Sequence, residues 1–174
     1  MKETKIKVAI LGVGNCASSL VQGIDYYSKN KTEDGLISDK IGGYSVSDIE
    51  IVAAIDINDK KVGKDLAEAI FETPNNSIKF QNISRTGVIV NPGKALDGIG
   101  RFVESKINIA RDSEDTVKLL IDSGAEIMVN LLPVGSDEAV KYYAQCAIEA
   151  KVGFINCIPV FIARDDEWKN KFKE

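Results

Sequence analysis

A chain of 174 residues can enclose one good hydrophobic core, and this length fits one domain or most of one. Hydrophobic residues make up 44% and charged residues 28%, with a net charge of −4, which indicates a globular protein and argues against disorder and a nucleic-acid partner. No apolar run approaches the roughly 20 residues of a membrane span, so we expect a cytoplasmic protein with no membrane partner.

The chain contains no histidine and three cysteines. Imidazole is the commonest general base near neutral pH and the commonest metal ligand, so a Ser-His-Asp or Cys-His site is excluded within the chain. Cys16, Cys146 and Cys157 form no C-x-x-C pair and are odd in number, which argues against a disulfide framework and a thiolate metal site. We expect three packing thiols, no metal, and chemistry that depends on lysine, carboxylate, tyrosine or a bound cofactor.

Residues 8 to 17 combine a buried-strand pattern, a glycine-rich turn and the start of a helical pattern. Gly12 would allow a tight turn, Gly14 would omit the Cβ that keeps a pyrophosphate from the backbone, and Ala17 would let the helix pack closely on the strand. The free N–H groups at the positive end of that helix would then face phosphates. The alternative is that small residues form such a turn by chance. The second predicted strand, which ends in an acidic residue, argues against that alternative.

The first helix is expected near residues 18 to 27, with an apolar stripe of Leu20, Val21, Ile24 and Tyr27 against the sheet. Residues 28 to 48 lack the regular spacing of apolar residues that a helix or a strand would show. They predict a long loop, or excursion, before the next strand. Such a segment would cover a ligand, belong to a subunit contact, or be an inert surface insertion.

Residues 49 to 55 predict a second buried strand, and Asp56 follows at its carboxyl end. A dinucleotide-binding unit places there the acid that binds the adenosine ribose hydroxyls, which would select NAD over NADP. Asp56 follows Gly14 by more than the about 20 residues that are usual in this motif. The long loop before the second strand accounts for the difference. The alternative is that Asp56 only begins a turn.

A second helix is expected near residues 60 to 71, with Asp65 as a solvated charge on its outer side and an inward stripe of Val62, Leu66, Ala69 and Ile70. Residues 72 to 110 predict loops and a short hairpin that includes the strand-like residues 86 to 90.

Regular patterns return with Ser113, which is expected to cap a helix through about Ser123 that Gly124 ends. Its inward residues would be Val117, Leu120 and Ile121. A strand at residues 127 to 132 follows. The loop after it, which contains Leu132 and Pro133, would lie where a doubly wound sheet opens its ligand crevice, on the nicotinamide side of a site.

Ser136 is expected to cap the next helix, whose inward residues would be Val140, Tyr143, Ala144, Ala147 and Ile148. A strand at residues 153 to 158 and a charged helix at residues 165 to 174 complete the chain. That helix has no closing strand, so the chain looks unfinished. Strands that alternate with helices predict an α/β fold with a Rossmann-like, doubly wound parallel sheet, here one NAD-binding domain over residues 1 to 174.

Six blocks of the chain resemble, in the same order, the amino-terminal part of prokaryotic myo-inositol-1-phosphate synthases: residues 12–23 (GVGNCASSLVQG), 60–63 (KKVG), 96–100 (LDGIG), 132–136 (LPVGS), 143–147 (YAQCA) and 159–163 (PVFIA). The resemblance covers essentially the whole chain. It implies an isomerase of inositol and phospholipid biosynthesis that converts D-glucose 6-phosphate into 1L-myo-inositol 1-phosphate by internal oxidation with NAD, aldol cyclisation and reduction.

The resemblance also implies the NAD contacts. The pyrophosphate would lie against Gly12, Gly14, Asn15 and Cys16, the adenosine ribose against Asp56, and further contacts would come from Asp65, Ser123 and Tyr143. Ser123 stands where close relatives have alanine, so only a backbone or packing contact would carry over. For Tyr143, a role as a core aromatic residue is as well supported by the sequence as an NAD contact.

In the family, the lysines and carboxylates that transfer protons lie further along the chain, in a substrate and oligomerisation domain. We therefore expect no catalytic residue here, and a fragment or half of a split enzyme that binds NAD but makes no inositol phosphate alone. Its partners would be glucose 6-phosphate in the complete enzyme and either a homo-oligomer, such as a homotetramer, or a complementing carboxy-terminal half. The alternatives are a non-catalytic NAD-binding regulatory module, a fragment of another NAD-dependent dehydrogenase, and a methyltransferase.

Overall fold

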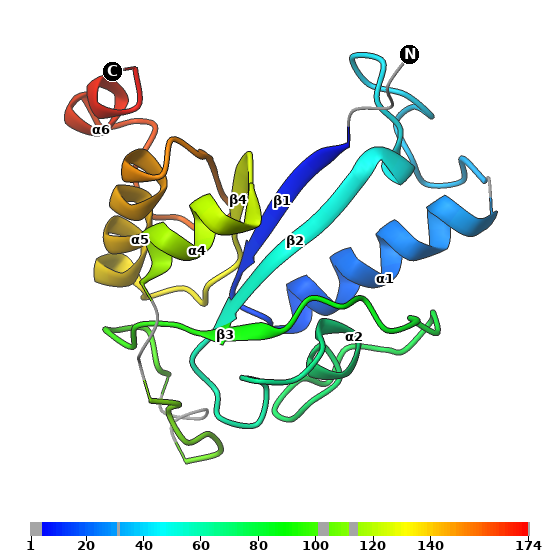
Figure 1. The fold of residues 1–174 in the computed structure, drawn as a ribbon, viewed down its shortest axis with the longest axis horizontal. Helices are drawn as coiled ribbons and strands as arrows, with labels where there is room; N and C mark the ends of the chain where they lie inside the picture. The colour runs from blue at the N-terminus through cyan, green and yellow to red at the C-terminus, as the bar shows by residue number, and fades with distance from the viewer. Residues whose placement is uncertain (1–4, 31, 101–104, 112–114, 174) are drawn as a thin grey trace.

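A computed structural model describes residues 5–30, 32–100, 105–111 and 115–173, and its centre is a five-stranded parallel sheet (Figure 1). The order is β3-β2-β1-β4-β5. The strands are β1 (Ile6–Leu11), β2 (Ile49–Asp56), β3 (Val90–Pro92), β4 (Ile127–Asn130) and β5 (Gly153–Asn156). The chain runs outward from β1 to β3 and then returns to place β4 on the other side of β1. This reversal defines a doubly wound sheet, so the predicted Rossmann-like α/β class is confirmed.

Helices cover both faces of the sheet (Figure 1). The covering helices are α1 (Asn15–Asn30), α2 (Leu66–Ala69), α4 (Thr116–Ser123) and α5 (Asp137–Glu149), and the described chain also contains the short 3-10 helix η1 (Val46–Asp48) and helix α6 (Asp166–Lys171). Side chains alternate between the faces of β1, so Ile10 packs with α1 and α2, whereas Ala9 and Leu11 pack with α4 and α5. None of the described helices has both the length and the apolar sequence that a bilayer crossing requires.

The register brings the carboxyl ends of the strands to one edge of the sheet. Leu11 lies beside Ile55 on one side and beside Asn130 on the other, and Asn130 lies beside Asn156. The loops that leave these strands therefore all emerge at the same edge, which is where the candidate site lies.

The first two helices differ from their expected bounds. Helix α1 begins at Asn15, directly after the glycine-rich turn and before the expected start. Helix α2 is much shorter than expected, because turns occupy the residues before it and Gly63 has a φ of +82°, which an α-helix does not accommodate.

The prediction of a solvated Asp65 is wrong, because this residue is 4% exposed and caps α2. Its Oδ1 accepts hydrogen bonds from the Ala67 N–H at 2.9 Å, the Thr86 N–H at 3.0 Å and the Thr86 hydroxyl at 2.8 Å, while Oδ2 accepts from the Gly87 N–H at 2.7 Å. Burial raises the pKa of Asp65, but these hydrogen bonds outweigh it and leave the pKa below its usual value.

Within the described residues 72–100 and 105–110 the chain is mostly irregular, as expected, but the predicted hairpin is wrong. Strand β3 pairs with β2 in parallel. The residues just before β3 lie against the start of α2 instead, where the Leu66 N–H donates to the Val88 carbonyl at 2.8 Å and the Val90 N–H donates to the Lys64 carbonyl at 2.9 Å. Contacts with a distant segment thus replace the local pairing that the pattern indicated.

Helix α4 begins and packs differently from the prediction. The expected cap, Ser113, lies outside the described residues, and the Asp115 carboxylate caps the helix by accepting from two of its N–H groups. Gly124 ends the helix as expected. Ile121 is 58% exposed rather than inward, and Leu119 packs against the core in its place.

The aromatic residues of the last helix find partners within this chain. Trp168 packs beside Val140 and Val160, and the Phe172 ring stacks on the Phe154 ring with centroids 6.3 Å apart. The sequence pattern did not show these contacts because they join the end of the chain to α5 and β5.

Candidate functional site

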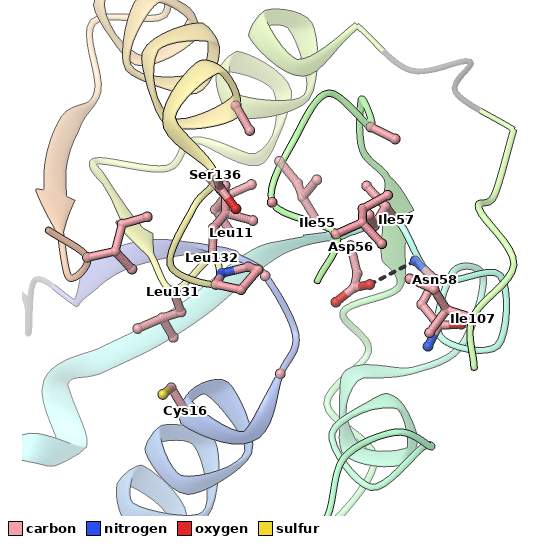
Figure 2. Close-up of a pocket in the computed structure, with 18 of the residues that line it drawn as sticks. Leu11, Cys16, Ile55, Asp56, Ile57, Asn58, Ile107, Leu131, Leu132 and Ser136 are labelled. Atoms are coloured by element: carbon pink, nitrogen blue, oxygen red, sulfur yellow. Dashed lines mark hydrogen bonds between the residues drawn. The ribbon is translucent and has the colours of Figure 1, made fainter. Parts of the chain in front are cut away.

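A cavity of about 630 Å³ opens at the carboxyl edge of the sheet, where β1, β2 and β4 end (Figure 2). Doubly wound sheets bind their ligands at this point, where the strand order reverses. The volume falls in the range of about 300–1,000 Å³ that is typical of small-molecule sites. The walls come from the glycine-rich turn, the residues after β2, residues 74–76, residues 94–99 and the loop after β4.

The glycine-rich turn connects β1 to α1 at the floor of the cavity. Gly12 has a φ of +87°, and a Cβ on it would lie 3.1 Å from the Leu131 carbonyl oxygen, so its backbone packs directly against the loop after β4. A Cβ on Gly14 would meet nothing within 4 Å. Gly14 therefore leaves open space in the cavity wall, beside the first N–H groups of α1, which have no partners within the helix.

Asp56 ends β2 and faces the same cavity (Figure 2). Its Oδ2 accepts a hydrogen bond from the Val13 N–H at 2.8 Å, and its Oδ1 accepts from the Asn58 N–H at 2.8 Å. The carboxylate thus both begins a turn and contacts the glycine-rich segment. Each carboxylate oxygen can accept about two hydrogen bonds, so Asp56 retains acceptor capacity toward the cavity.

The structure brings most of the predicted cofactor residues together around this cavity: Gly12, Gly14, Asn15, Cys16, Asp56, Leu132, Pro133 and Tyr143. It does not bring Asp65 or Ser123 there. Asp65 caps α2, and Ser123 lies at the end of α4, where its hydroxyl donates to the Leu120 carbonyl at 3.0 Å. These two residues could reach a ligand only through other groups.

The Asn15 side chain is turned away from a ligand role. Its Nδ2 donates to Asn76 Oδ1 at 2.9 Å, and its Oδ1 accepts from the N–H groups of Asn76 at 2.8 Å and Ser77 at 3.1 Å. The side chain therefore holds residues 76 and 77 against the first turn of α1, where Asn15 lines the cavity.

Tyr143 is 1% exposed and packs in the core between α5 and the sheet. Its hydroxyl accepts a hydrogen bond from the Lys94 N–H at 2.8 Å, at the edge of the cavity. The ring is thus a core aromatic residue, while the hydroxyl fixes one wall of the cavity.

The expectation of three packing thiols is correct only for Cys146, which is buried, and burial raises the pKa of its thiol. Cys16 and Cys157 are exposed and line the cavity. Cys16 lies in the first turn of α1 (Figure 2). Within the described ranges, no cluster of histidine, cysteine, aspartate and glutamate side chains is arranged to hold a metal ion.

Lys61 is a site residue that the sequence patterns did not single out. It is 3% exposed, and its Nζ donates to the Val13 carbonyl at 2.8 Å and to Asn75 Oδ1 at 2.9 Å, with Asp56 Oδ2 at 3.8 Å. Burial lowers the pKa of Lys61, and the Asp56 carboxylate opposes that shift. The available signal was the Lys-Lys-Val-Gly block soon after Asp56, although its pattern does not show which lysine turns inward.

Asp97 is the second residue that sequence reasoning missed. Its carboxylate accepts from the N–H groups of Glu138 at 2.8 Å and Ala139 at 3.0 Å, and so caps α5 from a distant loop. Ser136 occupies the expected cap position, but within the described structure its hydroxyl makes no cap hydrogen bond. A Cβ on Gly98 would overlap the Ser136 side chain, so the loop packs tightly against the helix end.

Replacing Asp97 with alanine is expected to lower the free energy of unfolding by about 1–2 kcal/mol, because two N–H groups at the positive end of α5 lose their acceptor. Urea denaturation of the variant and the wild type measures this difference. Asp137→Asn removes a charge from the same turn and keeps the Asp97 cap, so it should cost only a few tenths of a kcal/mol. Equal losses in the two variants would contradict the cap.

Comparison with known proteins gives matches over nearly the whole chain. An inositol-3-phosphate synthase from Mycolicibacterium smegmatis is 51% identical over 175 residues, which cover 98% of this chain and 48% of the relative. The inositol-3-phosphate synthases of Mycobacterium tuberculosis (49% identical) and Corynebacterium glutamicum (47% identical) match 98% and 100% of this chain and 48% and 49% of their own lengths. The chain belongs to the inositol-3-phosphate synthase family.

The chain spans about half the length of the curated family members that it matches. No protein-family model matches it. Among solved structures, Ari2 is 32% identical with a TM-score of 0.80, over 97% of this chain and 51% of Ari2. A myo-inositol-1-phosphate synthase-related protein from Thermotoga maritima is 21% identical with a TM-score of 0.71, over 96% of this chain and 51% of that protein. This match shows that the fold is shared.

Proposed function

We propose that this chain binds NAD in the cavity at the carboxyl edge of its sheet, as the amino-terminal, cofactor-binding part of an inositol-3-phosphate synthase. The observation that carries the proposal is that the open space at Gly14, the first turn of α1 and the Asp56 carboxylate all face one cavity. Phosphates fit the first two features, and ribose hydroxyls fit the third.

Different residues around the cavity would contact different parts of the dinucleotide. The backbone from Gly12 to Cys16 would hold the pyrophosphate, Asp56 would accept from the adenosine ribose hydroxyls, and Leu132 and Pro133 would lie on the nicotinamide side. Tyr143 would support this site from the cavity wall, whereas Asp65 and Ser123 do not line the cavity and would act on NAD only through other groups. When bound, NAD supplies a hydride acceptor and donor.

For the complete protein, we propose the conversion of D-glucose 6-phosphate into 1L-myo-inositol 1-phosphate, in the cytoplasm. The family membership supports this activity, because the matched relatives are inositol-3-phosphate synthases. The groups that transfer protons would lie in the half of those relatives that this chain does not match. A homo-oligomer, or a complementing carboxy-terminal half, would bring such groups to this cavity.

Isothermal titration calorimetry with the purified chain tests the proposed ligand. We expect saturable binding of NAD, binding of NADP that is weaker by tenfold or more, and no binding of S-adenosylmethionine. NADP should be weaker because its 2′-phosphate would meet the Asp56 carboxylate. Failure to bind NAD, or a preference for S-adenosylmethionine, would contradict the proposal.

We expect the purified chain, incubated with NAD and glucose 6-phosphate, to form no inositol phosphate. The physical reason is that the reaction needs acid–base groups for its proton transfers, and we place those groups outside this chain. Chromatography of the sugar phosphates measures the product, and the full-length M. smegmatis relative under the same conditions is the positive control. Clear turnover by this chain alone would show that the placement is wrong.

A further inference from the structure

The peptide groups on both sides of Val13, the residue between Gly12 and Gly14, are held by side chains from other segments. The Val13 N–H donates to Asp56 Oδ2 at 2.8 Å, and the Val13 carbonyl accepts from Lys61 Nζ at 2.8 Å and from Asn75 Nδ2 at 3.0 Å. The Val13 side chain is itself buried against α1 and α2. The turn is therefore fixed by contacts that involve no ligand.

Lys61 is suited to this task because its ammonium group lies inside the protein. Its side chain is 4% exposed, and two of its three donors are used by Val13 and Asn75. Asp56 at 3.8 Å supplies the opposite charge that a buried ammonium group requires. Asp56 holds the Val13 N–H and Lys61 holds the Val13 carbonyl. The two contacts together therefore restrict the movement of the Val13 backbone more than either would alone.

Asn75 completes the arrangement. Its Oδ1 accepts from Lys61, while its Nδ2 donates both to the Val13 carbonyl and to the Ile70 carbonyl at 3.0 Å, at the end of α2. This one amide therefore joins the glycine-rich turn to the end of α2 and to the lysine.

We propose that Lys61 and Asn75 are positioning residues that hold the glycine-rich turn in its phosphate-binding conformation before any ligand binds. The identity of the ligand rests on the proposed function, whereas the state of the free turn does not. A turn that is already ordered loses less conformational entropy when it binds a diphosphate, which raises affinity without a direct contact. Lys61→Met and Asn75→Ala should therefore weaken the binding of ligands that contain a diphosphate.

The first measurement uses the ligand-free protein. Hydrogen exchange followed by NMR should show the Val13 and Gly14 amide protons exchanging at least tenfold faster in Lys61→Met and in Asn75→Ala than in the wild type. Lys60→Met is the matched control, because Lys60 is the neighbouring lysine and its side chain is exposed. Unchanged exchange in both variants would overturn the proposal.

The second measurement separates positioning from general damage. NAD and ADP-ribose, which contain a diphosphate, should bind at least tenfold more weakly to each variant, while adenosine, which lacks phosphate, should bind within twofold of the wild type. Equal losses for all three ligands would indicate a merely structural role and overturn the proposal. If Lys61→Met does not fold, Asn75→Ala carries both measurements.

The two hypotheses fail in different ways. If the wild type does not bind NAD, the proposed function is wrong, and the exchange of the free turn still decides whether Lys61 and Asn75 hold it. If the wild type binds NAD and both variants bind it equally well, the positioning role is wrong and the proposed function stands.

Discussion

Replacing Gly14 with valine is expected to abolish measurable NAD binding, by a loss of at least 100-fold, while the protein stays folded. The absent Cβ of Gly14 faces open space, and φ at this residue lies outside the left-handed region, so the backbone accepts a side chain without strain. The added methyl groups would occupy the place of the pyrophosphate and cover the first N–H groups of α1. A 100-fold loss corresponds to about 2.7 kcal/mol of binding free energy.

Calorimetry measures the affinity, and thermal unfolding checks the fold. Gly23→Val is the matched control, because Gly23 lies within α1, outside the cavity, and a Cβ there would also meet nothing within 4 Å. We expect that variant to bind NAD as the wild type does. Normal binding by Gly14→Val would mean that the phosphates lie elsewhere.

Replacing Asp65 with alanine is expected to lower the free energy of unfolding by about 3 kcal/mol at neutral pH. The substitution removes the acceptor of four hydrogen bonds, and the Ala67 N–H at the start of α2 loses its cap. It also detaches Thr86 and Gly87 from α2, just before the segment that becomes β3. Thr86 and Gly87 are exposed, so water can replace part of their loss, which keeps the expected effect below the sum of four bonds.

Urea denaturation between pH 2 and pH 7 tests this prediction and its sign. Because the pKa of Asp65 in the folded protein lies below the ordinary value of 3.8, its carboxylate contributes fully above that value, and the contribution is lost as pH falls through the lower folded pKa. The difference between wild type and Asp65→Ala should therefore shrink in acid. Asp122→Ala, which removes an exposed carboxylate, should cost under about 0.5 kcal/mol, and an equally small loss for Asp65→Ala would contradict its structural role.

The alternation of strands and helices, the glycine-rich turn, the position of Asp56 and the end of α4 at Gly124 could all be predicted from the sequence. Each depends on a short stretch, either through the period of its apolar residues or through the backbone conformation that a glycine permits. The carboxyl edge as the place of the site followed as well, because parallel strands end at one edge.

The stretch of residues 72 to 100 could not be placed in this way, because its sequence has no period of apolar residues to show which face is buried. Its packing decides that Asp65 is a buried cap rather than a solvated charge, and that the Asn15 side chain accepts hydrogen bonds from the N–H groups of residues 76 and 77. It also supplies Asp97, which caps a helix that begins 40 residues later in the numbering.

The sequence by itself therefore determined the strands β1, β2, β4 and β5, their alternation with helices and the glycine-rich turn, since each of these elements depends on residues that are neighbours in the chain. Only the tertiary structure decided which charged side chains turn inward and what they hold: Lys61 and Asp56 on opposite sides of Val13, and Asp97 at the end of α5. The reason is that a buried charge is stable only beside partners that folding brings to it, and those partners lie far away in the sequence.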